Sequence, residues 1–136
     1  MAIPSLPIQN PCDVVTFLTT GTLATKQYTF VYQSDVNHVQ AAVAAQNEEG
    51  FNVYILQNSP GAGEEAECGV LGTGDSFLKI ATGAVAIGAV LSCSTASAAR
   101  LSTAGSLLYA RAKDVATAAD DIIVVRTLDG QSSQST

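Results

Sequence analysis

"YILQNSPGAGEEAECGVLG" (residues 54–72) decides the fold of this chain. Within it, Gly61, Gly63 and Ala66 fit the relaxed form of a fingerprint in which glycines let the backbone approach a pyrophosphate. Such a fingerprint has to connect a strand to a helix inside a βαβ unit. The stretch is therefore either a nucleotide-binding loop or the turn of a β-hairpin.

The residues after the glycines favour the hairpin. Three glutamates within residues 64–67 stand where a pyrophosphate would lie, and they would repel it because no cation is close in the sequence. Three further glycines within residues 69–74 would end a helix after about two turns. Pro60 before the glycines and the small apolar residues that alternate over 66–70 are typical of a turn followed by a strand. We therefore expect a hairpin here and no nucleotide.

Short segments rich in β-branched and aromatic residues recur on both sides of this hairpin, with glycines and other turn residues between them. The segments expected as strands are QYTFVY (27–32), FNVYILQ (51–57), AECGVLG (66–72), SFLKIA (76–81), IGAVLSC (87–93), AARLST (98–103), SLLYARA (106–112) and DIIVVRTL (121–128). They are too short and too closely spaced to leave room for crossover helices. The sequence predicts an all-β fold, a small β-barrel or β-sandwich of short antiparallel strands.

Two alanine-rich segments leave the secondary structure open. In DVNHVQAAVAAQNEE (35–49), valines recur near helical spacing, so residues 36–49 fit either a short helix or a strand hairpin. In AKDVATAAD, residues 112–120 fit one turn of helix before the last strand. The expected fold therefore contains at most one short helix.

The chain of 136 residues has room for one domain with a hydrophobic core. Three prolines near the start hold the backbone extended, which predicts an N-terminal arm over residues 1–15. A single β domain is expected over residues 16–128. The polar residues 129–136 have the composition of a flexible C-terminal tail.

The arm carries apolar side chains that would be exposed if it stood alone, so we expect them to lie against a neighbouring subunit or another partner. The residues of this expected contact are Ile3, Pro4, Leu6, Pro7 and Ile8. A disordered terminus is the alternative. Removing residues 2–11 is expected to leave the β domain folded.

Charged residues make up only 13% of the chain and hydrophobic residues 47%, a balance that is expected where a partner covers part of the surface. The formal net charge of −6 argues against a nucleic acid, because binding to its phosphates depends on lysine and arginine. The three cysteines, at positions 12, 68 and 93, are too widely spaced for a metal knuckle. They indicate small buried side chains in a reducing compartment.

Residues 80–99 carry no charge and are long enough to cross a bilayer. Most of them are small residues that gain little from lipid, so we expect no membrane span. Residues 2–11 have no positively charged start and contain three prolines, so no signal peptide is expected. Synthesis in the cytoplasm follows from this interpretation.

No group of residues has the pattern of an active site. His38, the single histidine, stands beside Asp35 and Asn37, and we interpret it as a surface residue of a polar turn. The acidic pairs at 48–49 and 120–121 lack the ligand spacing of a calcium site and are typical of solvated turns. The sequence predicts no enzyme, no metal site and no cofactor.

From Gly50 onward the order of turns and strands resembles the small head decoration, or capsid cement, proteins of tailed bacteriophages. The hairpin at 54–72 is followed by a glycine-containing step made by Ala86, Ile87, Gly88 and Leu91, although Ile87 and Gly88 are closer together than in the family pattern. The closing phrase YARAKDVATAADDIIVVRTL (109–128) is similar to the end of that family. The likeness covers residues 28–128 and leaves out the arm.

The resemblance implies a β-barrel or β-sandwich without enzymatic activity, added to the outer surface of an expanded capsid. It implies a homotrimer that bridges subunits of the major capsid protein, so the expected location is the virion surface. Two rivals remain open: a small β-barrel with a ligand in its mouth, which would be a monomer or dimer, and a small membrane protein built on residues 80–99.

Overall fold

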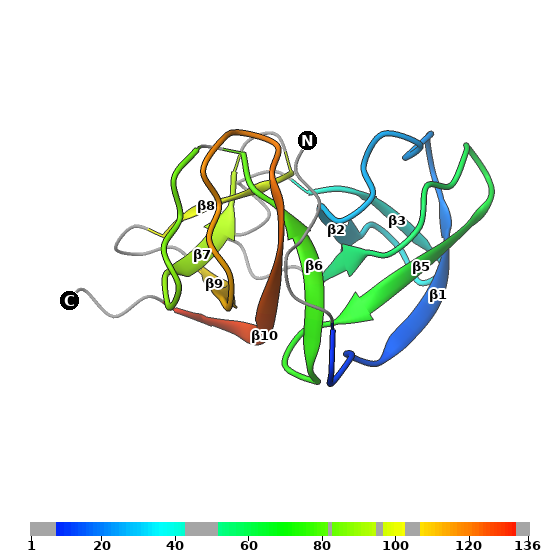
Figure 1. Cartoon of the computed structure of the whole chain (residues 1–136). Helices are drawn as coiled ribbons and strands as arrows, with labels where there is room; N and C mark the ends of the chain where they lie inside the picture. The colour runs from blue at the N-terminus through cyan, green and yellow to red at the C-terminus, as the bar shows by residue number, and fades with distance from the viewer. Residues whose placement is uncertain (1–7, 43–51, 82, 95–96, 103–106, 133–136) are drawn as a thin grey trace.

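The computed structural model describes residues 8–42, 52–81, 83–94, 97–102 and 107–132 of the chain. Within these residues the regular structure consists of strands without a helix (Figure 1). The strands are β1 (Val14–Thr19), β2 (Phe30–Gln33), β3 (His38–Ala41), β4 (Val53–Leu56), β5 (Glu65–Val70), β6 (Asp75–Lys79), β7 (Val90–Cys93), β8 (Ala99–Leu101), β9 (Leu107–Ala112) and β10 (Ile122–Ser132). The prediction of an all-β fold is confirmed.

The first five strands form a closed barrel in the order β1-β3-β2-β4-β5. β4 and β5 pair antiparallel with Leu56 opposite Cys68, so residues 54–72 form a hairpin, as predicted. β1 pairs antiparallel with β5 but parallel with β3, which departs from the expected antiparallel pairing. The reason is geometric, because strand direction cannot alternate all the way round a closed ring with an odd number of strands.

β2 and β4 are buried on both faces, which explains why their sequences are almost continuously apolar. Successive side chains of a strand point to opposite faces. Val31 and Leu56 therefore point into the barrel, whereas Phe30 and Ile55 point out of it, toward the second sheet. All four side chains are fully buried.

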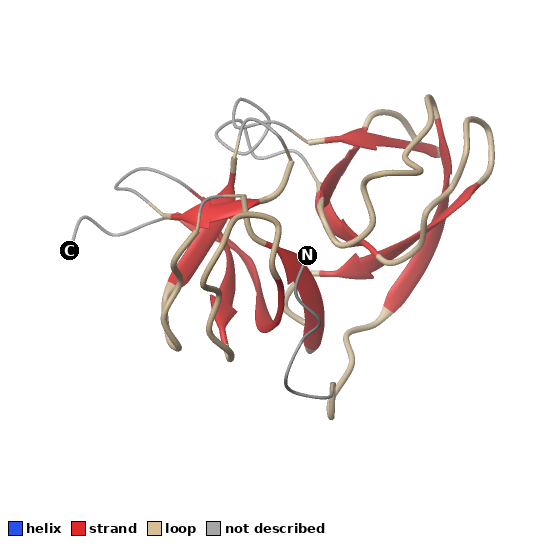
Figure 2. Ribbon diagram, turned by 45° about the horizontal axis from the view of Figure 1, so that its top comes forward, coloured by secondary structure: helices blue, strands red, loops and turns tan. Residues whose placement is uncertain are grey.

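The remaining five strands form a second sheet in the order β6-β10-β9-β7-β8. A bridge between Ile80 and Ala99 brings the end of β6 to β8, so the sheet curls until its first and last strands meet. Leu91 and Ile123 of this sheet share one hydrophobic cluster with Phe30 and Ile55 of the barrel. The barrel and the curled sheet lie side by side over this common core (Figure 2).

The two alanine-rich segments are not helical where the structure describes them. Residues 38–41 form β3, and residues 43–49 lie outside the described residues. In the second segment, Ala116 pairs with Val85, and the carboxylate of Asp121 accepts hydrogen bonds from the amides of Thr117 and Ala118. The helical alternative does not hold for this segment, because Ala112 ends β9, Ala116 is paired with Val85, and the residues that follow form a turn that Asp121 closes.

Two predicted boundaries fall inside strands. β1 begins at Val14, so the last part of the expected arm belongs to the barrel. β10 continues to Ser132, beyond the expected end of the domain at residue 128. Residues 133–136 of the expected tail lie outside the described residues.

Candidate functional site

Four of the predicted contact residues, Ile3, Pro4, Leu6 and Pro7, lie outside the described residues, and their contacts stay a prediction. Ile8, the fifth, is the first described residue and is half-buried. The structure does describe the residues that connect this segment to the domain. We call residues 10–13 the arm root.

The arm root is hydrogen-bonded to the start of β6. The amide of Cys12 donates to the carbonyl oxygen of Asp75 at 2.9 Å, and the amide of Asp75 donates to the carbonyl oxygen of Asn10 at 2.8 Å. Pro11, between them, forms a parallel bridge with Asp75. Proline suits this place because it has no amide hydrogen to satisfy.

The next residue of the arm root is bound to the turn between β5 and β6. The amide of Asp13 donates to Oγ1 of Thr73 at 2.9 Å, and its carbonyl oxygen accepts from the amide of Val70 at 2.8 Å. Oγ1 of Thr73 itself donates to the carbonyl oxygen of Val70 at 2.7 Å. The arm root is thus attached by both backbone and side-chain groups, and it behaves as part of the domain.

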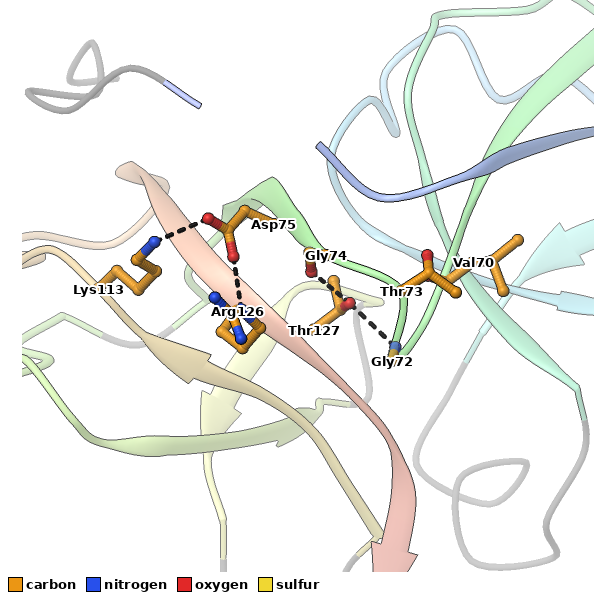
Figure 3. Close-up of polar contacts among 8 residues, drawn as sticks. All are labelled: Val70, Gly72, Thr73, Gly74, Asp75, Lys113, Arg126 and Thr127. Atoms are coloured by element: carbon orange, nitrogen blue, oxygen red, sulfur yellow. Dashed lines mark hydrogen bonds and ion pairs between the residues drawn. The ribbon is translucent and has the colours of Figure 1, made fainter. Parts of the chain in front are cut away.

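Gly74 allows the close approach of these segments. A Cβ atom at this position would lie 2.6 Å from the carbonyl oxygen of Asn10 and 2.8 Å from that of Pro11, which is closer than real side chains come. Thr127 of β10 holds the same turn, because its Oγ1 donates to the carbonyl oxygen of Gly74 at 2.6 Å and accepts from the amide of Gly72 at 3.0 Å (Figure 3). The position therefore requires glycine for packing.

Asp75 joins the arm root to the second sheet through its side chain. Its carboxylate is 1% exposed and accepts hydrogen bonds from Nζ of Lys113 and Nε of Arg126, both at 2.7 Å (Figure 3). Burial by itself would raise the pKa of Asp75, but the Lys113 ammonium and the Arg126 guanidinium outweigh it and lower the pKa below its ordinary value. The carboxylate is therefore kept ionised, which suits a structural anchor and does not suit a group that exchanges protons near neutral pH.

The glycine loop at residues 57–64 is attached to the barrel. Oγ1 of Thr19 donates to the carbonyl oxygen of Gly61 at 2.8 Å. The amide of Leu23 donates to the carbonyl oxygen of Pro60 at 2.9 Å. The amide of Gly61 donates to the carboxylate of Glu64. A glutamate of the loop thus takes the amide that a phosphate would need, which agrees with the rejection of a nucleotide site.

His38 begins β3, and its Nδ1 lies 2.8 Å from the carboxylate of Asp35 in a polar turn, as the sequence indicated. The acidic pair at 120–121 is only partly as expected, because Asp121 is buried and closes its turn. The pair at 48–49 lies outside the described residues. In the described part of the chain, no three His, Cys, Asp or Glu side chains gather as a metal site would require.

The three cysteines are free and buried, which confirms their interpretation as small core side chains. Burial raises the pKa of Cys68 and of Cys93 to about 12, so both thiols stay protonated at neutral pH. The uncharged run at 80–99 contains the strand β7 and the start of β8. Over the described ranges, the structure has no helix with the length and hydrophobicity needed to cross a bilayer.

Sequence reasoning missed Asp75 and its two cationic partners. Asp75 falls among the turn residues between the expected strands 66–72 and 76–81, and the sequence pattern singles out neither Lys113 nor Arg126. The signal that could have found them is a charged residue at the end of an otherwise apolar strand, as with Arg126 after four aliphatic residues of β10. The sequence does not identify the carboxylate partner of Arg126. The structure does, because Arg126 of β10 is paired with Asp75 of β6.

No protein-family model matches this chain, and no curated protein is significantly similar to it in sequence.

Proposed function

We propose that this protein is a structural component of a tailed-bacteriophage virion that decorates and stabilises the outside of the capsid. In this proposal it has no enzymatic activity, and it binds the major capsid protein as a homotrimer through residues 1–8. The observation that carries the proposal is the attachment of the arm root to Asp75 and to the turn before it. This attachment gives the apolar N-terminal segment a fixed starting point on the domain.

Physical chemistry supports a binding role for this segment. Prolines at positions 4, 7 and 11 restrict the chain before it binds, so less conformational entropy is lost when it docks. Its apolar side chains, Ile3, Leu6 and Ile8, would gain from burial against a shell subunit. Because the copies of a trimer are linked, their individually weak contacts with the shell would together give strong attachment. The net charge of −6 suits a surface that does not meet the packaged genome.

The ligand-binding rival is disfavoured by the packing of the barrel. Its interior is filled by apolar side chains, of which Val31, Leu56, Ala66 and Cys68 are fully buried. A barrel that holds a small ligand needs an interior cavity lined by a few polar groups. We therefore place the binding function on the outside of the domain.

The test is copurification of the protein with icosahedral particles in a fixed ratio to one abundant shell protein. The informative variant removes residues 2–7, because the structure makes residues 10–13 part of the domain and a deletion of 2–11 would damage it. A second variant keeps the chain length and replaces Ile3, Leu6 and Ile8 by serine. We expect both variants to stay folded and to lose occupancy on particles by roughly tenfold or more.

The matched control changes two polar residues of the same segment, Ser5→Ala and Gln9→Ser, which leaves the apolar side chains and the prolines in place. Its occupancy should equal that of the unaltered protein. Normal decoration by the 2–7 deletion would refute the role of the arm. Failure of the unaltered protein to associate with any particle would refute the proposed function.

A further inference from the structure

β1 and β5 form the wall of the barrel that lies farthest from the second sheet (Figure 1). Glu65 and Glu67 alternate along β5 with side chains that are buried in the barrel interior, so both glutamates point outward. In the β1–β5 register, Leu18 is opposite Glu65 and Thr16 is opposite Glu67. Side chains of directly opposed residues lie on the same face of a sheet. The outer surface of this wall therefore combines a leucine, a threonine and two glutamates.

Three large aliphatic side chains are exposed on this wall or beside it. Val14 alternates with Thr16 along β1 and is 51% exposed, and Leu18 is 39% exposed. Val36, in the turn before β3, is 79% exposed, and it lines one shallow depression of about 260 Å³ together with Leu18 and Glu65. These aliphatic side chains would gain free energy if a partner covered them. We call the following set of outward side chains the barrel face: Val14, Thr16, Leu18, Val36, Glu65 and Glu67.

The two glutamates of the barrel face have no cation beside them. Among the described residues, the carboxylates that form ion pairs are those of Asp35 and Asp75. Residues 1–72, which include all five barrel strands, hold seven of the twelve carboxylates of the chain and one of its six cationic side chains. A partner that covered the aliphatic side chains would also remove water from the glutamates, and this costs free energy unless the partner supplies a cation there.

This combination of charge and apolar area restricts the chemistry of the partner. The phosphates of a nucleic acid or of an anionic lipid surface would be repelled by the glutamates. A second copy that presented its own barrel face would bring like charges together. A metal ion needs more ligands than two carboxylates, and the described residues contain no group of three suitable side chains. The partner that fits is a protein surface on which lysine or arginine side chains surround apolar ones.

The barrel face is continuous with the segment to which the proposed function assigns the shell contact. β1 starts directly after the arm root, and the chain from Ile8 to Val14 spans at most about 20 Å. A subunit held by residues 1–8 is therefore within reach of the barrel face. We propose that the barrel face docks on the same shell subunit, on a patch where lysine or arginine side chains surround apolar ones. The inference rests on the proposed function, which supplies the shell as the partner.

Titration of undecorated particles with the full-length protein tests this contact. Val36→Ser and Leu18→Ser remove the apolar part of the barrel face, and the double variant Glu65→Gln, Glu67→Gln removes its charge. Val36 is the most exposed of these residues and stands in a turn, so circular dichroism and thermal melting of Val36→Ser should match the unaltered protein. We expect the dissociation constant to rise roughly fivefold or more in each variant. Added salt should weaken the unaltered protein more than the double variant.

The matched controls make the same chemical changes on the second sheet. Ile87→Ser replaces an aliphatic side chain that is 68% exposed, and the double variant Asp120→Asn, Asp129→Asn removes two exposed carboxylates. Both controls should bind particles like the unaltered protein. An equal loss of affinity in the controls would overturn the inference, because net charge or general surface polarity would then explain it.

Two further outcomes separate this inference from the proposed function. If the barrel-face variants bind particles as tightly as the unaltered protein, the inference is wrong and the proposed function stands. If the unaltered protein binds no particle, the proposed function is wrong, and the inference is wrong with it. The mass of the free protein in solution is measured beside each titration. A change of that mass in Val36→Ser would place the barrel face between copies of this chain and overturn docking on the shell.

Discussion

Nζ of Lys113 lies 2.7 Å from Oδ2 of Asp75, a residue 38 positions earlier in the chain. The contact joins the turn after β9 to the first residue of β6, and the backbone of that same residue holds Asn10 and Cys12 of the arm root. A change in the carboxylate of Asp75 should therefore alter the stability of both the second sheet and the arm root.

Asp75→Asn keeps the size of the side chain but removes the charge that Lys113 and Arg126 share. Because both cations are roughly half exposed and can turn to water, we expect a loss of about 1–3 kcal/mol in the free energy of unfolding, less than for a fully buried pair. Urea unfolding measures it, and amide exchange at Cys12 should become faster. Asp129→Asn, at an exposed carboxylate, is the control. Equal stability of the two variants would mean that the ion pairs contribute nothing.

The pH dependence of stability should carry the signature of Asp75. Its pKa in the folded protein is lowered from the ordinary value of 3.8, so folding favours the ionised form. The resulting stabilisation is complete above the unfolded pKa and is lost as pH falls through the folded pKa. The difference in unfolding free energy between the unaltered protein and Asp75→Asn should thus shrink below about pH 4. A difference that stays constant from pH 6 to pH 2.5 would contradict this linkage.

Gly74→Ala should loosen the arm root without changing any charge. The added methyl group would meet the carbonyl oxygens of Asn10 and Pro11, and these belong to backbone that cannot move without breaking its hydrogen bonds to Asp75. We expect a loss of about 1–3 kcal/mol, as for an overpacked core, together with faster amide exchange at Asp75. Gly21→Ala is the matched control, because a Cβ atom there meets nothing within 4 Å. Equal exchange in the two variants would show that the arm root tolerates the methyl group.

The strands were largely predictable from sequence because most of them alternate or are continuously apolar between turn residues. Each of the eight segments expected as strands overlaps a strand of the structure, from 27–32, which overlaps β2, to 121–128, which overlaps β10. The sequence did not predict β1. A surface strand usually alternates apolar and polar residues, but the exposed face of β1 carries the apolar residues Val14 and Leu18, so this pattern is absent. β3 was ambiguous because alanines follow it.

The arm root and its anchor were beyond sequence reasoning for a different reason. Asn10 and Asp75 are far apart in the chain, and their contact depends on backbone groups that every residue carries. The glycine pattern at 72–74 did indicate a turn, but nothing in it shows which segment packs against Gly74. Long-range backbone contacts of this kind follow from the barrel's closure, which pairs β1 with β5 and so brings the arm root to the β5–β6 turn.

Tyr109→Phe should stabilise the protein. Tyr109 is 2% exposed, and its ring packs against Phe30 with 5.2 Å between centroids, so the ring belongs to the shared core. Its hydroxyl has no hydrogen-bond partner in the described part of the chain. A buried hydroxyl without a partner costs free energy, and phenylalanine keeps the ring contact, so we expect a gain of about 0.5–1.5 kcal/mol in unfolding free energy.

Tyr32→Phe is the matched comparison for this prediction, because the hydroxyl of Tyr32 donates to Oε1 of Gln40 at 3.1 Å. Removing that hydroxyl should lower the unfolding free energy by about 0.5–1.5 kcal/mol, the opposite sign to the change at Tyr109. Thermal unfolding of the two variants beside the unaltered protein distinguishes the cases. A loss of stability in Tyr109→Phe would mean that the hydroxyl is satisfied in solution, and the core around Phe30 would then contain a polar contact that stabilises it.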